Sequence, residues 1–109
     1  MKDTRYELLV VIADQGYTDM TMDAARAADA PGGTVIHAKG TGTEQAERFL
    51  GVSIAAEKEM IFMVTRREGK NAIMRAIMDQ AGLATEARAI VFSLPVTETA
   101  GMRLLEEEP

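Results

Sequence analysis

The chain has 109 residues, of which 47% are hydrophobic and 27% charged, with a formal net charge of -5 and a pI of about 4.8. This length predicts one domain over residues 1–109 with one two-layer core, and the composition excludes the disordered and membrane classes. The acidic balance argues against a general nucleic-acid surface, and the absence of cysteine excludes disulfides, thiolate metal sites and a cysteine nucleophile.

The first predicted element is a strand from Tyr6 to Ala13, apolar on both faces and therefore buried on both. Its apolar run, Leu8 to Ala13, is too short for a signal peptide or a membrane span. We therefore expect no membrane insertion. The absence of cysteine favours a cytoplasmic location.

A helix is predicted from Asp19 to about Asp29, after turn residues at 14–16 and with Thr18 as its N-cap. Residues at three-then-four spacing indicate its buried stripe. These are Tyr17, Met20, Ala24, Ala27 and Ala28. Ala30, Pro31 and the glycines at 32–33 end this helix and begin a second strand from Thr34 to Lys39.

A long polar segment, residues 40–56, separates this strand from the next. Hairpin connections usually take about two to five residues, and loops much longer than a dozen are normally functional or disordered. The segment is therefore predicted to be a functional loop on a rigid sheet. Phe49 and Leu50 within it either pack against a neighbouring subunit or contact a target.

The second half of the chain repeats the pattern of strand, helix and strand. A strand is predicted from Lys58 to Arg66, and a helix from Lys70 to Ala81 with Gly82 at its C′ position. The helix buries an apolar stripe of Ile73, Met74, Ile77, Met78 and Ala81. A last strand covers 89–96, and a frayed acidic tail begins at about residue 98.

The order β-α-β-β-α-β predicts an α+β, ferredoxin-like fold, with two helices on one face of a four-stranded antiparallel sheet. Two helices cover only one face, yet the strands at 6–13 and 58–66 are apolar on both. The uncovered face would be a larger apolar patch than soluble monomers normally expose. The sequence therefore predicts a homo-oligomer that buries this face, with methionine well represented there.

Two segments, TVIHAKGTG at 34–42 and IVFSLPV at 90–96, together with the element order and the long loop, resemble the PII signal-transduction and PII-like proteins. The resemblance covers nearly the whole chain. It implies a compact homotrimer with an adenine nucleotide (ATP, ADP or AMP) between subunits. It also implies that the long loop, the T-loop of that family, controls a target protein, either a membrane transporter or a metabolic enzyme.

The resemblance also implies which residues approach the nucleotide. Thr34 on the second strand and Gly40, Thr41 and Gly42 at the loop base match family positions near the ligand, and glycine there permits close backbone approach. Lys39 and Lys58 flank the loop and supply charge for phosphates. Arg88 lies in the stretch that corresponds to the family's phosphate loop, and Arg103 falls near its C-terminal arginines.

Two features depart from the family pattern. The phosphate loop, glycine-rich with a lysine in the family, here reads GLATEARA over 82–89, so that Arg88 replaces the lysine. The loop at 40–56 is short and lacks tyrosine, which excludes uridylylation of a loop tyrosine. The chain therefore resembles a divergent, short-loop member.

No nucleophile and base have a convincing spacing, so we expect a regulator and not an enzyme. His37 is the only histidine; no partner carboxylate can be placed for it, which favours a strand or interface role. The alternative to a nucleotide-binding regulator is a divalent-metal-responsive trimer of the CutA type, with metal held by His37 and acidic residues. Nucleotide titration separates the two.

Overall fold

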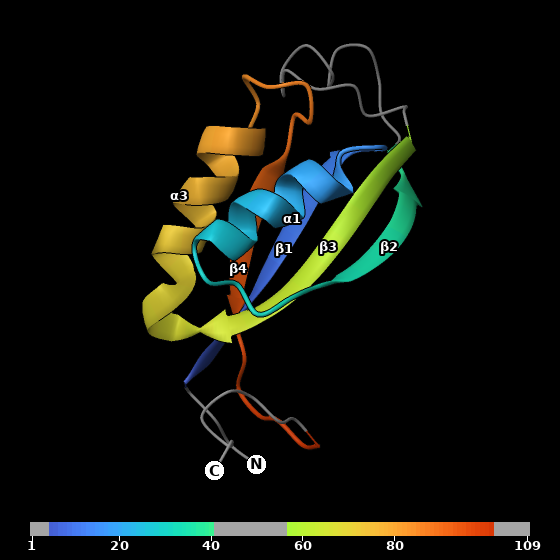
Figure 1. Ribbon diagram of the computed structural model, residues 1–109. Helices are drawn as coiled ribbons and strands as arrows, with labels where there is room; N and C mark the ends of the chain where they lie inside the picture. The colour runs from blue at the N-terminus through green and yellow to red at the C-terminus, as the bar shows by residue number, and fades with distance from the viewer. Residues whose placement is uncertain (1–4, 41–56, 102–109) are drawn as a thin grey trace.

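The computed structural model describes residues 5–40 and 57–101. The strands there are β1 (Tyr6–Asp14), β2 (Thr34–Lys39), β3 (Glu57–Arg66) and β4 (Ile90–Pro95). The helices are α1 (Thr18–Ala27) and α3 (Lys70–Ala81), the latter preceded by a 3-10 turn, η1 (Arg67–Gly69). Both helices lie on one face of an antiparallel sheet of order β2-β3-β1-β4 (Figure 1). The predicted ferredoxin-like fold is confirmed.

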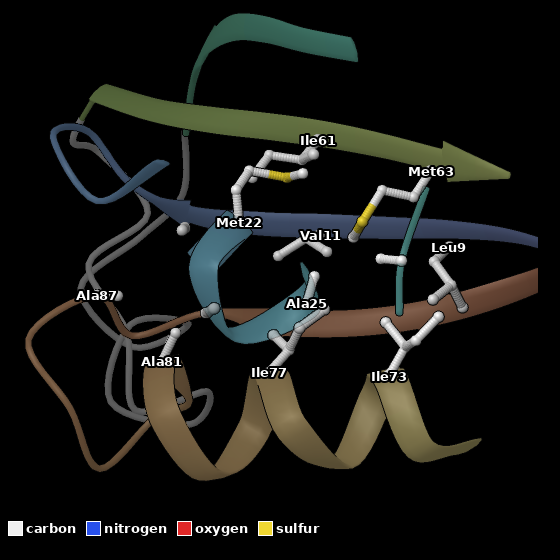
Figure 2. Packing of buried hydrophobic residues seen from close by; sticks show 13 residues of the cluster. Leu9, Val11, Met22, Ala25, Ile61, Met63, Ile73, Ile77, Ala81 and Ala87 are labelled. Carbon is white, nitrogen blue, oxygen red and sulfur yellow. The ribbon is translucent and has the colours of Figure 1, made fainter. Parts of the chain in front are cut away.

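The hydrophobic core lies between the sheet and the two helices (Figure 2). Leu9 and Val11 of β1 pair with Met63 and Ile61 of β3, and all four side chains are buried on the helix side. The core-facing stripe of α3 repeats every four residues, as a helix that packs on a sheet requires. It consists of Ile73, Ile77 and Ala81.

The predicted core-facing stripe of helix α1 is correct for Tyr17, Ala24 and Ala28, which pack on the core. It is wrong for Met20 and Ala27, which are exposed. The buried residues of α1 are Thr21, Met22, Ala24 and Ala25, whereas Met20 is 38% exposed. Thr21 was not among the predicted stripe residues; its hydroxyl donates a hydrogen bond to the carbonyl of Tyr17 at 2.8 Å. This bond satisfies the hydroxyl within the helix, so that burying it is not penalised.

The end of α1 is a Schellman motif built without glycine. The amide of Ala30 donates to the carbonyl of Ala25 at 3.0 Å, and the amide of Asp29 to that of Arg26 at 2.9 Å. Asp29 takes the left-handed position, with φ 70°, where helices usually place glycine. The chain then turns towards β2.

The sheet face opposite the helices is apolar, and within residues 5–40 and 57–101 no helix covers it. Val10, Phe62 and Phe92 form one cross-strand row on this face, and Ile12, Met60 and Ile90 form the next. The exposed fractions are 42% for Ile36, 39% for Ile90, 42% for Phe92 and 45% for Leu94. An exposed apolar sheet face was predicted from the alternation of the strands, and the structure has it.

The methionines are less concentrated on this face than predicted. Within the described ranges Met60 alone faces that side, while Met22 and Met63 lie in the core and Met20 and Met78 on the helix surfaces. The apolar face is instead built from branched aliphatic and phenyl side chains. These residue types suit a pleated surface better than methionine does.

Candidate functional site

Four charged residues converge at one end of the sheet, where β1 and β2 finish and β3 begins (upper end in Figure 1). They are Asp14, Lys39, Glu57 and Lys58, brought together by the register, which pairs Asp14 with Lys58 and Lys39 with Glu57. The turn after β1 is bound to the neighbouring strand because the amide of Gln15 donates to the carbonyl of Glu57 at 3.2 Å. Cationic and anionic groups thus alternate across this end.

Lys58, one of the predicted binding residues, forms an ion pair with Asp14. Its Nζ lies 2.5 Å from Oδ1 of Asp14, and the two side chains are only 8% and 24% exposed. A partly buried pair in low dielectric is stronger than a surface pair. The Lys58 ammonium is therefore already paired with the Asp14 carboxylate in the single chain.

Lys39 has a weaker partner. Its Nζ lies 3.7 Å from Oε1 of Glu57, and both side chains are more than half exposed. Exposed pairs of this kind contribute little, typically about 0–1 kcal/mol, so Lys39 remains available to an anion. Gly40 directly follows β2. The predicted residues Thr41 and Gly42 lie outside the described residues, as does the loop from residue 41 to residue 56.

Glu59 joins three elements at this end, and sequence reasoning did not identify it. Its Oε1 accepts hydrogen bonds from the amide of Gly16 at 3.1 Å and the hydroxyl of Thr18 at 2.5 Å. Thr18 was predicted to cap α1 with its side chain; it is instead the first residue of α1, and the Tyr17 N-cap makes no side-chain bond. The hydrogen bond from the Thr18 hydroxyl to Glu59 connects the start of α1 to β3.

His37 was expected to lack a carboxylate partner, but it faces Glu59 across the β2–β3 pairing. Its Nδ1 lies 3.7 Å from Oε2 of Glu59, with the histidine 73% exposed and the glutamate 10%. This contact could not be predicted from the sequence because the long loop separates the two residues along the chain. The contact lies between two strands of the sheet and belongs to no metal-binding group among the described residues.

Arg88 occupies the loop that leads into β4, close to the same end of the sheet. The carbonyl of its neighbour Ala87 accepts a hydrogen bond from the amide of Asp14 at 2.9 Å. Ala87 and Ala89 are fully buried core residues, whereas Arg88 is exposed with φ 50°. The alanines therefore anchor the loop and turn the guanidinium outward.

Tyr17 and Glu86 connect this loop to the start of α1. The phenol of Tyr17 donates to Oε2 of Glu86 at 3.4 Å. The negative charge of the Glu86 carboxylate raises the pKa of Tyr17 above its ordinary value. The loop of 83–89 and the turn of 15–17 are thus in contact through this hydrogen bond.

Thr34 does not join the other predicted residues. It opens β2 and pairs with Phe62. Five strand positions separate it from Lys39, a span of about 17 Å at roughly 3.4 Å per residue. Within one chain the fold therefore gathers Lys39, Gly40, Lys58 and Arg88 and leaves Thr34 apart. The remaining predicted residue, Arg103, lies outside the described residues.

Two kinds of feature are absent from the described part of the chain. Residues 5–40 and 57–101 contain no group of three histidine, aspartate or glutamate side chains placed to hold a metal ion. In the same ranges no helix has the length and apolar character needed to span a membrane.

Comparison with known proteins gives one family and one fold. A family model described as nitrogen regulatory protein P-II matches residues 6–106. Among solved structures, the chain is similar to Arabidopsis thaliana PII bound to citrate, with a TM-score of 0.65, 16% identity, and coverage of 87% of this chain and 78% of that chain. At this identity the likeness shows the fold alone. No curated protein matches the chain.

Proposed function

The chain belongs to the nitrogen regulatory protein P-II family, and from this premise we propose that it is a regulator that binds an adenine nucleotide between the subunits of a homotrimer. ATP, ADP or AMP occupies the cleft between neighbours. The loop of residues 40–56 responds to the ligand and controls a target transporter or metabolic enzyme. It is a cytoplasmic binding protein without catalytic activity of its own.

The observation that carries this proposal is the uncovered sheet face. Its outer positions expose Ile36, Ile90, Phe92 and Leu94 by about two fifths each. Burying the exposed two fifths of each side chain gains about 0.6–1.2 kcal/mol, that is, two fifths of the roughly 1.5–3 kcal/mol for complete burial, so assembly through this face is favourable. Three copies that meet there create clefts between neighbouring sheet edges.

The separation of Thr34 from the other site residues supports a shared cleft. Lys39, Lys58 and Arg88 approach the ligand from one subunit, and Thr34 of the next subunit completes the site. The pairs that Lys39 and Lys58 form with Glu57 and Asp14 hold both ammonium groups at the loop base. A bound phosphate competes with these carboxylates and changes the conformation of the loop base, which couples occupancy to the loop.

Calorimetric titration of the native assembly with ATP, ADP, AMP and cyclic nucleotides tests the proposal. We expect saturable binding of at least one nucleotide, and Gly40→Val should weaken it without dissociating the assembly. A well-folded trimer that binds none of these ligands would exclude the nucleotide role. Binding that is undiminished in both Lys58→Ala and Arg88→Ala would instead place the nucleotide elsewhere.

A further inference from the structure

A cavity lies at the other end of the sheet, between the start of α3, the end of α1 and the last residues of β3. It measures about 340 Å³ and is lined mainly by apolar groups. The nine residues of β1 span the sheet from Tyr6, at this cavity, to Asp14. At roughly 3.4 Å per residue the two ends are about 27 Å apart. The cavity is therefore separate from the residues proposed for the nucleotide.

The walls suit the body of a small organic molecule. Ala28, Pro31, Val64, Ala72 and Ile73 contribute apolar surface. The volume falls at the lower end of the range of about 300–1,000 Å³ that is typical of ligand pockets. A cavity of this volume is too small for a hydrated nucleoside triphosphate. It suits a compact ligand with one apolar group.

Thr65 provides a buried polar group in this wall. It is 5% exposed, and within residues 5–40 and 57–101 no hydrogen bond engages its hydroxyl. Buried hydroxyl groups in folded proteins nearly always have a partner. A polar atom of a ligand in the cavity would supply the partner that the described chain does not.

Asp29 is one of three charged residues that line the cavity, and the other two, Arg66 and Glu68, form an ion pair with each other at 3.7 Å. Asp29 holds the left-handed Schellman position, which favours glycine, and it places a carboxylate at the negative end of the α1 dipole. The left-handed conformation and the carboxylate at this end of the dipole each lower the stability of the fold slightly. Asp29 forms no ion pair with a described residue that would offset this effect. Aspartate tolerates the left-handed conformation better than most residues, so the position of its charge beside the cavity, unpaired with any described residue, is the feature that points to a ligand.

We propose that this cavity binds a small molecule with a protonated amine on an apolar body. The ammonium lies against the Asp29 carboxylate and the C-terminal end of α1, where a cation is favoured. The body packs on the apolar wall, and a polar atom meets the Thr65 hydroxyl. Two sources share this chemistry, an apolar α-amino acid and the corresponding amine without a carboxylate.

Titration of the native assembly with L-leucine, L-phenylalanine, isoamylamine and phenethylamine, followed by calorimetry, tests the proposal. Saturable binding is expected for at least one amino acid or amine, and none for isovalerate or phenylacetate, which lack the amine. Tighter binding of the amino acids would identify the first source, and tighter binding of the amines the second.

Variants locate the site. Asp29→Asn keeps the size of the side chain and removes its charge, so affinity should fall about tenfold or more. Thr65→Val replaces the hydroxyl with a methyl group of similar shape and should weaken binding several-fold. Asp19→Asn removes a carboxylate near the other end of α1 and is the matched control, expected to bind like the unmodified chain.

Two further variants separate loss of binding from loss of fold. Asp29→Gly relieves the left-handed strain, so it should melt no lower than the unmodified chain and yet bind weakly. A Cβ at Gly69 would have Thr65 Oγ1 at 3.7 Å as its only neighbour within 4 Å, so Gly69→Leu fits the backbone and fills the cavity. Adenine-nucleotide binding should be unchanged in both. Absence of binding by all four amine probes, or unchanged affinity in Asp29→Asn, would overturn the proposal.

Discussion

Glu59 shows how much one buried carboxylate can organise at the residue scale. It accepts from the Gly16 amide and the Thr18 hydroxyl, and it faces His37. Glu59→Ala leaves both donors without an acceptor and should lower the free energy of unfolding by about 1–3 kcal/mol. Glu59→Gln keeps an acceptor oxygen and should cost less. Urea denaturation measures both; equal stability of the alanine variant and the unmodified chain would contradict this role.

The Tyr17 phenol gives a pH-dependent test at the same scale. Because Glu86 raises its pKa above 10.0 in the fold, the folded chain keeps this proton longer than the unfolded chain. The resulting stabilisation is present below pH 10 and is lost as the pH rises through the raised folded value. Glu86→Gln should move tyrosinate formation to lower pH in an ultraviolet titration. An unchanged titration curve would show that the carboxylate does not act on the phenol.

Sequence reasoning identified cations near this end of the sheet but not their partners. Lys39, Lys58 and Arg88 were predicted from a family resemblance, and the fold brings them to one end. The partners Asp14, Glu57 and Glu59 depend on strand register, which sets the cross-strand neighbour of each residue. The alternation of charge over 57–59 was the available signal, because a strand that begins with three charged residues requires charged neighbours.

At the scale of elements, the regular periodicity of α3 predicted its buried stripe except for Met78, which is 39% exposed. Ile73 and Ile77 are the bulky branched residues of α3 and lie where the four-residue repeat places them. In α1 the prediction was correct for Ala24 but missed Thr21 and Met22, which are buried. The small residues of α1 carry little signal, and a hydroxyl satisfied inside the helix is buried in place of Met20. The hydrophobic pattern of a sequence therefore predicts which side of a helix faces the core only where one stripe is clearly more apolar than the others.

A matched pair of substitutions on α3 tests this packing. Ile77 is fully buried and its neighbour Met78 is 39% exposed. Ile77→Ala should destabilise the fold by about 2–5 kcal/mol because it leaves a cavity in the core. Met78→Ala should cost much less, since its side chain is partly hydrated already. Similar melting temperatures for the two variants would contradict the observed rotation of α3.

At the scale of the whole molecule, the helix-free sheet face determines the proposed assembly. Leu94 lies on that face and Leu83 follows α3, and both are 45% exposed. Leu94→Asp should dissociate the assembly into single chains, because it places a charge in the apolar face that the contact buries. Leu83→Asp adds the same charge away from the contact and should leave the assembly intact. Size-exclusion chromatography with light scattering distinguishes the two outcomes.

The molar mass of the native protein in dilute solution is the most direct measurement. One chain weighs 11.8 kDa. Sedimentation equilibrium should yield three times that mass, independent of concentration across the range in which Leu94→Asp is a single chain. A stable, folded species with the mass of one chain would show that the apolar face does not drive assembly, and would remove the basis for a ligand site shared between subunits.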